Sequence, residues 1–517
     1  MSVWRSRNVA RDGGTRSRWQ VLLLDNPPEI CDKGLLSPLR DMRELPPNEQ
    51  REAPPPATPA AVAPRIDATR TDLRQTIAAR PRDTAEIMIP GNPFWRQTYD
   101  VSADDFLDDH WQERHTVKSA QELQAMVGDR VPPEFLADVA AGLRKAPMSM
   151  RVTPYILSLI DWSTPYDDPL RTQFIPVASR MKPDHPKLTF DALAEQDDAP
   201  MPGLTHRYPD RALFLALHTC PVYCRFCTRS YDVGPATDTA DKASIGIDRE
   251  RWQRSIDYIA AHPDICDVVV SGGDASLLRP EQVRWIGRTL LSVPAIRRIR
   301  FATKVLAVLP QKLFRDSSPW LQALTEVADY GRGMEKDVAL HTHANHPNEI
   351  SWITAQAAQQ LYRRGIACRN QSVLLRGVND TSDAMKTLVR KLSDCHITPY
   401  YVYVHDLVKG VEDLRTPLHT ALDIEKSVRG TIAGFLMPTF VVDTLGGGGK
   451  RNAHSFECYN RTTGVAVYTS PVKPGRHFFS FDPIHLLPEE GQRRWADPAQ
   501  HQAIMDEAVA MARDAQH

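Results

Sequence analysis

Three cysteines lie within one short stretch, "HTCPVYCRFCTRSYDVG" (218–234), and they are Cys220, Cys224 and Cys227. Their C-x3-C-x2-C spacing differs from the paired CxxC of a zinc ribbon. Three thiolates in one loop can each bind one iron of a 4Fe–4S cluster, which leaves the fourth iron open to chelate a substrate. The alternatives are a structural zinc site that borrows a histidine such as His218, and a chance clustering of buried cysteines.

A lysine preceded by four glycines is the second unusual feature, in "FVVDTLGGGGKRN" (440–452). The glycines let the backbone approach a ligand closely and let its N–H groups face an anion. A nucleoside-triphosphate loop needs Ser or Thr after the lysine, and Arg451 stands there. Lys450, at the end of a β-run, can instead form a Schiff base with pyridoxal phosphate, for whose phosphate Arg207 and Arg211 in "THRYPDR" offer cations. A flexible surface loop with an incidental lysine, and ordinary surface ion pairs for both arginines, are the alternatives.

The elements that position these residues alternate regularly from about residue 212 onward. Short apolar runs predict six strands, at 212–217, 267–272, 297–303, 338–343, 372–377 and 400–405. Amphipathic segments predict the helices between them, at 249–263, 280–293, 320–331, 353–365 and 383–395. Six βα units imply an α/β fold with a parallel sheet, either a partial (βα)6 TIM-like barrel or a doubly wound layer. In both, reactive groups gather in loops after the carboxyl ends of strands, where Cys220 stands.

The composition fits a soluble globular protein, with 517 residues of which 42% are hydrophobic. Lys plus Arg (63) nearly balance Asp plus Glu (64), so no long-range field favours nucleic acid or an anionic membrane. A small-molecule substrate is therefore expected. No apolar run approaches the roughly 18 to 20 residues that span a bilayer. The other cysteines lack the spacing of a disulfide framework, which predicts a reducing, cytoplasmic location.

Four regions are expected along the chain. Residues 1–90 contain a Pro/Ala-rich linker and an arginine-rich start, which fits a disordered basic tail or an organelle transit peptide, so a disordered extension is predicted. Residues 91–204 carry helical patterns, and residues 205–434 carry the βα alternation. Residues 435–517 hold the glycine-lysine segment and a tail that is expected to form a few strands covering the cofactor.

The order and spacing of these motifs resemble those of a large enzyme family and, within it, those of one smaller family. The cysteine spacing after a first strand resembles the signature of the radical S-adenosylmethionine enzymes, and "SGGDASL" (271–277) resembles their glycine-rich segment after the second strand. The set "GLTHRYPDRALFLALHTCPVYCRFCTRS", "HANHPNEI", "NQSVLLRGVND", "YYVYVHDLVKGVEDLRTP" and "PTFVVDTLGGGGK" resembles the lysine 2,3-aminomutase family. This resemblance runs from Trp111 to Lys450, roughly two thirds of the chain. It is specific, because few chains combine a radical-generating cluster with a pyridoxal lysine.

The resemblance implies a 4Fe–4S cluster, S-adenosyl-L-methionine and pyridoxal 5′-phosphate as cofactors. Its cluster ligands match the three cysteines, and its catalytic lysine, which holds pyridoxal phosphate, matches Lys450. The implied pyridoxal phosphate contacts are Arg207, Tyr208, Arg211 and Tyr403. The implied S-adenosylmethionine contacts are Gly272, Gly273, Asp274, His346 and Gln371. The implied substrate contacts are Arg229 for the carboxylate, and Asp406 and Asp443 for a distal ammonium.

The resemblance implies an isomerase that moves the α-amino group of L-lysine from C2 to C3 to give β-lysine. In the mechanism that the resemblance implies, a 5′-deoxyadenosyl radical removes a hydrogen from the β-carbon, the nitrogen migrates through a pyridoxal phosphate aldimine, and the hydrogen returns. Two acids facing one cation form charge-assisted hydrogen bonds of about 1.5–3 kcal/mol each. Glutamate-specific relatives do not carry both acids, so the substrate should end in a cation.

Other functions stay open at this point. An arginine 2,3-aminomutase is the first, because a guanidinium would also satisfy the two aspartates. A relative that acts on a lysine later attached to a translation elongation factor is the second. A non-catalytic iron–sulfur or zinc protein is the third, and either aspartate alone could simply cap a neighbouring turn.

The resemblance also implies an electron donor such as flavodoxin or ferredoxin, and a possible homo-oligomer. Known members bind a structural zinc at a subunit interface, through a cysteine soon after the "RGVND" segment and a cluster near the C-terminus. This chain has Thr381 near the first place and only Cys458 in the C-terminal region. The prediction is therefore that this zinc site is absent and that assembly does not use it.

Overall fold

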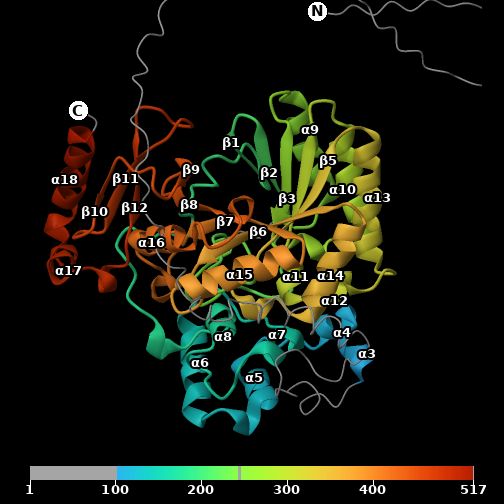
Figure 1. Ribbon diagram of the computed structural model, residues 1–517, viewed down its shortest axis with the longest axis horizontal. Helices are drawn as coiled ribbons and strands as arrows, with labels where there is room; N and C mark the ends of the chain where they lie inside the picture. Colours follow the sequence, from blue (N-terminus) through green and yellow to red (C-terminus); the bar gives the residue numbers. More distant parts are fainter. Residues whose placement is uncertain (1–101, 243–245, 516–517) are drawn as a thin grey trace, which may run out of the picture. The chain divides into compact units, whose positions relative to one another are not determined.

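The computed structural model describes residues 102–242 and 246–515. Its centre is a nine-stranded sheet whose strands follow one another in chain order (Figure 1). The strands are β1 (Leu204–Tyr208), β2 (Arg211–Leu217), β3 (Asp267–Gly272), β4 (Arg298–Ala302), β5 (Asp337–Thr342), β6 (Ala367–Leu374), β7 (Ile397–Val404), β8 (Thr439–Thr444) and β9 (Gly449–Asn452). Strands β2 to β8 are parallel, while β1 and β9 are antiparallel to their neighbours.

The two edge strands of this sheet meet through Tyr208 and Lys450. The backbone N–H of Lys450 in β9 donates a hydrogen bond to the Tyr208 hydroxyl in β1 over 3.1 Å. The sheet is thereby nearly closed on itself, as a barrel is. The prediction of an α/β fold with a barrel-like parallel sheet is confirmed, and the sheet has nine strands where six were predicted.

Helices cover the outer face of the sheet. Those that follow the parallel strands are α9 (Arg249–Ala261), α10 (Pro280–Ser292), α11 (Val305–Val308), α12 (Gln311–Phe314), α13 (Pro319–Gly333), α14 (Trp352–Arg363), α15 (Ser382–Asp394) and α16 (Leu418–Val428). Their apolar stripes and the outward-facing strand residues form the main hydrophobic core. The five predicted helices and six predicted strands are all present.

The side chains of the strands alternate between this core and the inside of the sheet. On β4 and β5, Ile299, Phe301, Val338 and Leu340 belong to the main core. The residues between them therefore face inward. Many of these inward residues are polar, and they lie on the same side of the sheet as Asp443 and Lys450.

A helical region precedes the sheet and supports the cysteine loop. Its helices are α3 (Ala103–Phe106), α4 (Asp109–Arg114), α5 (Ala120–Val127), α6 (Pro133–Lys145), α7 (Pro154–Leu159) and α8 (Pro169–Phe174). In the loop, the N–H of Tyr223 donates to the carbonyl of Arg151 over 3.0 Å, and the N–H of Arg225 donates to the carbonyl of Gln173 over 2.9 Å. The helical region therefore fixes the path of the loop between Cys220 and Cys227.

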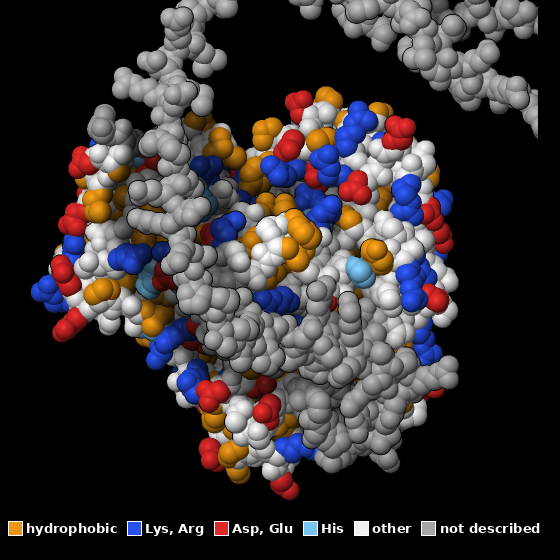
Figure 2. Space-filling model, in the orientation of Figure 1, with side chains coloured by type: hydrophobic (Ala, Val, Ile, Leu, Met, Phe, Trp, Pro, Cys, Tyr) orange, Lys and Arg blue, Asp and Glu red, His pale blue; other side chains and the backbone are white. Residues whose placement is uncertain are grey.

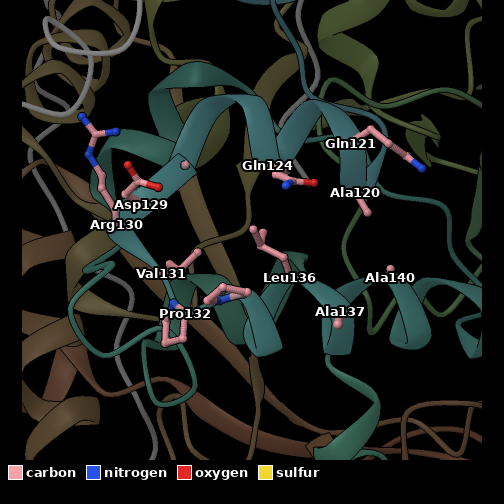
Figure 3. Close-up of a pocket in the computed structure, with 12 residues that line it drawn as sticks. Ala120, Gln121, Gln124, Asp129, Arg130, Val131, Pro132, Leu136, Ala137 and Ala140 are labelled. Atoms are coloured by element: carbon pink, nitrogen blue, oxygen red, sulfur yellow. The ribbon is translucent and has the colours of Figure 1, made fainter.

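A groove of about 850 Å³ lies between α5 and α6 (Figure 3). Its walls include Gln124, Arg130, Leu136 and Ala140. None of the residues that the sequence predicts for chemistry lines it.

The chain ends in a small second sheet with two helices. Its elements are β10 (Cys458–Asn460), β11 (Val465–Thr469), β12 (His477–Phe481), α17 (Glu489–Ala496) and α18 (His501–Asp514), in red at the left of Figure 1. The N–H of Leu445 donates to the carbonyl of Phe479 over 3.3 Å, and the Ser470 hydroxyl donates to the carbonyl of Gly448. The tail thus packs on the turn between β8 and β9.

The predicted extension over residues 1–90 lies outside the described residues, so it stays a prediction. Among the described residues, no helix combines the length and the apolar character that crossing a membrane requires.

Candidate active site

The three cysteines lie where the sequence predicts, in the loop after β2. All three are half-buried. Burial raises the pKa of each thiol, to about 12 for Cys224, and the neighbouring cysteines add to the rise for Cys220. Cys220 and Cys227 pack against the same small apolar cluster of Met148, Tyr223 and Val233, so these two cysteines lie in one part of the structure.

These thiols have the donor chemistry that iron or zinc prefers, and metal binding would remove their protons. Across residues 102–242 and 246–515, no group of three or more His, Cys, Asp and Glu side chains is already placed to hold a metal ion. The three cysteines therefore fit an iron–sulfur cluster by the chemistry of their thiols and by their place in one loop.

The glycine-rich segment after β3 packs against the start of the cysteine loop. The N–H of Gly273 donates to the carbonyl of Leu217, and the N–H of Asp274 donates to the carbonyl of Thr219 over 3.0 Å. A Cβ on Gly273 would lie 2.3 Å from the carbonyl oxygen of Thr219, so only glycine allows this approach. The Asp274 carboxylate accepts from the N–H of Lys304 over 2.7 Å, which ties it to the end of β4.

Lys450 lies on β9, directly opposite Asp443 on β8. Its Nζ donates to Asp443 Oδ2 over 2.8 Å, and it stands 5.6 Å from the ring centre of Tyr403. Burial alone would lower the pKa of Lys450, but the Asp443 carboxylate and the neighbouring tyrosines raise it well above its usual value. The amine is therefore held as an ammonium by the chain itself.

The glycines before Lys450 form the turn of this β8–β9 hairpin. Gly449 has a φ of +80°, and a Cβ there would lie 2.7 Å from the Tyr208 hydroxyl. The absence of a side chain at Gly449 therefore lets the backbone of the turn lie close to Tyr208. The alternative of a loose surface loop is wrong, because the segment is a hairpin that joins two strands of the main sheet.

Asp406 follows β7 and is brought close to Asp443, as the sequence predicts. Burial, and then the charge of Asp443, raise the pKa of Asp406 to about 7. Its Oδ2 accepts from the Thr228 hydroxyl over 2.6 Å. Its Oδ1 is buried and has no hydrogen-bond partner, and the same is true of Asp443 Oδ1. Two carboxylate oxygens are therefore available to a ligand that donates hydrogen bonds.

Arg229 is held by a buried acid that the sequence reasoning missed. Its Nε and Nη2 each donate to the Glu195 carboxylate over 2.8 Å, and the Tyr231 hydroxyl donates to the same group over 3.0 Å. Burial alone would raise the pKa of Glu195, but Arg229 lowers it. The guanidinium keeps its remaining edge for a second carboxylate.

The predicted pyridoxal phosphate contacts lie on both sides of Lys450. Arg207 is buried and donates to Asp198 over 2.6 Å, whereas Arg211 stacks 4.4 Å from the ring centre of Tyr208 and pairs with the neighbouring Asp210. Tyr208 and Tyr403 contact Lys450 itself. The structure therefore brings Lys450 and both tyrosines together. The Arg207 guanidinium is already paired with Asp198.

The last two predicted contacts have different partners. Gln371, on β6, accepts from the Tyr403 hydroxyl over 3.4 Å and so stands beside the lysine site. His346 caps a short helical turn after β5, where its Nδ1 accepts from the N–H of Asn348 over 3.1 Å. Burial lowers the pKa of His346 to about 4, so its ring is neutral.

Thr228 and Glu195 are the site residues that the sequence reasoning missed. Thr228 stands between a predicted cluster ligand and Arg229, so its position in the chain could have pointed to it. Glu195 lies in "LAEQDDAP", where nothing in the spacing separates it from the other acids. Only the fold brings it onto Arg229.

Comparison with known proteins shows the family of the chain. No protein-family model matches the chain. L-lysine 2,3-aminomutase from Clostridium subterminale is 40% identical over 352 residues, covering 68% of this chain and 79% of that protein. L-lysine 2,3-aminomutase from Bacillus subtilis is 34% identical over 358 residues, covering 69% and 70%. The chain belongs to the lysine 2,3-aminomutase family. It is therefore an enzyme, an isomerase of the 2,3-aminomutase type.

The chain is also similar to a protein with another substrate in its name. Glutamate 2,3-aminomutase from Clostridioides difficile is 31% identical over 343 residues, covering 66% of this chain and 75% of that protein. Among solved structures, a radical SAM methyltransferase from Sphaerobacter thermophilus is 15% identical, with a TM-score of 0.28 over 46% of this chain and 68% of that one.

Proposed function

We propose that this protein converts L-lysine into β-lysine, using a 4Fe–4S cluster, S-adenosylmethionine and pyridoxal phosphate. The single observation that carries the choice of substrate is the pair of buried acids, Asp406 and Asp443, beside one fixed cation, Lys450. With both acids ionised, this group has one negative charge in excess. A substrate ammonium cancels that charge, whereas a second carboxylate, as in glutamate, would add to it.

The cofactors supply the reactive groups. The cluster and S-adenosylmethionine, when bound, supply the electron and the adenosyl radical that removes a hydrogen from the substrate. Pyridoxal phosphate, when bound, supplies an electrophilic carbonyl carbon for the amine and a conjugated ring that spreads an unpaired electron. We assign the cluster to Cys220, Cys224 and Cys227, and the carbonyl carbon to Lys450.

The side chains of the site bind and orient the substrate. The free edge of Arg229 binds the substrate carboxylate, and Glu195 fixes the plane of the guanidinium. Asp406 and Asp443 bind the distal ammonium through their unpartnered oxygens. Thr228 connects the two ends, because it is adjacent to Arg229 and donates to Asp406. These contacts would hold the substrate between the cysteine loop and the β8–β9 hairpin.

The remaining predicted contacts complete the proposal. The glycines at 272 and 273 and the Asp274 backbone lie against the cysteine loop, where S-adenosylmethionine would bind the open iron. Gln371 stands between this region and Tyr403.

The test is an anaerobic assay with separate substrates. The protein is reconstituted with iron, sulfide and pyridoxal phosphate, given S-adenosylmethionine and a reductant, and offered L-lysine, L-arginine or L-glutamate. We expect β-lysine from the first tube, and none from the Cys224→Ala or Lys450→Ala protein. Cys266→Ala is the matched control, because Cys266 is a free cysteine outside the loop. Turnover of arginine alone would overturn the choice of lysine, and turnover of glutamate alone would overturn the role of the two acids.

A further inference from the structure

The segment between β7 and α16 holds the cysteine loop at two points. The first is the hydrogen bond from the Thr228 hydroxyl to Asp406, over 2.6 Å. The second is an ion pair, in which Nη2 of Arg225 donates to both carboxylate oxygens of Asp413 over 3.1 and 3.0 Å. Arg225 directly follows Cys224, inside the run of three cysteines. The proposed function uses the first contact and leaves the second without a role.

The ion pair of Arg225 and Asp413 is removed from water. The two side chains are only 4% and 9% exposed. Figure 2 shows the more usual arrangement in this protein, with Lys, Arg, Asp and Glu side chains mixed over the visible surface. A buried ion pair contributes little net stability, because the loss of hydration offsets the attraction between the charges. The position of this pair beside the cysteines therefore points to a role in fixing geometry.

Arg225 connects three parts of the chain. Its backbone N–H donates to the carbonyl of Gln173 over 2.9 Å, and its Nη1 donates to the carbonyl of Thr172 over 3.1 Å. Both carbonyls belong to α8, in the helical region that precedes the sheet. The cysteine loop is thus joined through one side chain to α8 and to Asp413, which lies 188 positions away from Arg225.

Asp413 also balances a second buried arginine. Arg171 on α8 is 2% exposed, and its guanidinium donates to three backbone carbonyls. Burial, and then the charge of Arg225, lower the pKa of Arg171 to about 10, while Asp168 and Asp413 act in the opposite direction. Loss of the Asp413 charge would therefore leave two neighbouring guanidinium groups with less opposing charge, and they would repel each other.

Asp413 is itself held in a fixed position. It lies in the short helical turn η5 (Glu412–Leu414), which Arg415 directly follows. Arg415 pairs with Glu412 over 2.6 Å, and these side chains are 2% and 1% exposed. Arg415 also donates to the carbonyl of Phe481 in β12. The turn is therefore anchored independently of the cysteine loop and can act as its support.

We propose that Asp413 is a positioning residue for the iron–sulfur cluster, because its grip on Arg225 fixes the path of the loop between Cys224 and Cys227. This inference depends on the proposed function, which assigns the cluster to the three cysteines. A 4Fe–4S cube has a fixed shape, so its thiolates must be presented at one spacing. Residues behind the metal ligands supply such orientation in metal sites generally.

The experiment measures how fast the cluster is lost to a chelator. The full-length protein is reconstituted anaerobically with iron and sulfide, and iron release to an excess of a ferrous chelator is followed by absorbance. We expect Asp413→Asn to lose iron about tenfold faster than the wild type, as is typical when a residue behind a metal ligand is removed. The electron paramagnetic resonance spectrum of its reduced cluster should also differ from that of the wild type. Asp413→Glu keeps the carboxylate and should recover part of both properties.

Asp267→Asn is the matched control for the loss of an ion pair. Asp267 pairs with Arg300 over 2.7 Å, and these side chains are 12% and 15% exposed. Asp267 stands at the start of β3, level with the start of β2, whereas the cysteine loop follows the other end of β2. This variant should lose iron at the rate of the wild type.

A double variant separates positioning from stability. Arg225→Met with Asp413→Leu leaves no buried charge unpaired at this place, so its melting temperature without the cluster should return toward that of the wild type. Its iron loss should stay about tenfold faster, because the connection to the loop is still missing. The inference is overturned if Asp413→Asn loses iron as slowly as Asp267→Asn, or if the double variant regains the wild-type rate. A wild type that takes up no iron and sulfide would overturn the proposed function, and this inference with it.

Discussion

Lys450 and Asp443 stand directly opposite each other on β9 and β8, and their side chains form an ion pair of 2.8 Å. The pair is asymmetric, because the Asp443 side chain is 3% exposed while that of Lys450 is 36% exposed. Loss of the ion pair should therefore cost more at Asp443, whose charge is buried, than at Lys450, whose charge water can partly solvate. Any change at Lys450 therefore acts on the charge around Asp443 as well as on the proposed bond to pyridoxal phosphate.

The first prediction follows from this asymmetry. Lys450→Met should abolish turnover and also lower the free energy of unfolding by about 1–2 kcal/mol, because it leaves a buried carboxylate without its cation while water screens part of the loss. Adding Asp443→Asn should restore most of that stability and none of the activity. Urea unfolding of the two single variants and the double variant gives the coupling energy. Strictly additive effects would show that the ion pair does not stabilise the fold.

Arg229 should have two separable roles. Arg229→Gln should raise the KM for the amino acid at least tenfold, because the substrate carboxylate loses a charge-assisted partner. It should also cost about 3 kcal/mol of stability, because Glu195 stays buried without a cation. The double variant Arg229→Gln with Glu195→Gln should regain the stability and keep the high KM. Steady-state kinetics and thermal unfolding check this, and a double variant with normal KM would remove Arg229 from the substrate site.

The sequence was sufficient to predict the strands that consist of an unbroken run of apolar residues. It predicted β2, β3 and β5 within a residue or two, because their apolar runs are unbroken. It placed the start of β6 five residues late, at 372 instead of Ala367. The reason is physical: Arg369 and Gln371 are polar because they face the inside of the sheet, and this interrupts the apolar pattern.

The positions of the candidate residues were predictable from the sequence where unusual residue types stand at an unusual spacing. The three cysteines, Lys450 and the two aspartates belong to motifs with unusual spacing, and the fold brings Asp406 and Asp443 together. Glu195 was not predictable, because it acquires its role only from Arg229, a partner 34 positions away in the sequence. The closure of the sheet by Tyr208 and Lys450 likewise depends on two residues 242 positions apart.

The Asp406 carboxyl should make the protein without cofactors less stable at higher pH. The folded chain holds this proton up to about pH 7, while the unfolded chain releases it near pH 4. Because the folded state binds the extra proton, stability falls as the pH rises from about 4 to about 7. Asp406→Asn removes this loss, so its advantage over the wild type should grow by about 1–3 kcal/mol between pH 5 and pH 8. Asp423→Asn, at an exposed position of α16, should behave alike at both pH values. Urea unfolding at the two pH values tests this prediction. If the difference in free energy of unfolding between Asp406→Asn and the wild type were the same at both, the pKa of Asp406 would not be raised in the folded chain.

Gly449 should be the most sensitive position of the glycine-rich turn. Alanine there must adopt a φ of +80°, and its Cβ would stand 2.7 Å from the Tyr208 hydroxyl that joins β1 to β9. We expect Gly449→Ala to cost about 2–3 kcal/mol, from backbone strain together with the displaced hydroxyl, and to weaken pyridoxal phosphate binding because Lys450 is the next residue. Gly446→Ala is the matched control, since its φ is +78° but no atom lies within 4 Å of the added Cβ, so it measures the backbone strain alone. Adding Tyr208→Phe to Gly449→Ala should recover the part of the cost that comes from the clash. If Gly446→Ala and Gly449→Ala lowered the free energy of unfolding equally, the contact between Gly449 and Tyr208 would carry no cost of its own.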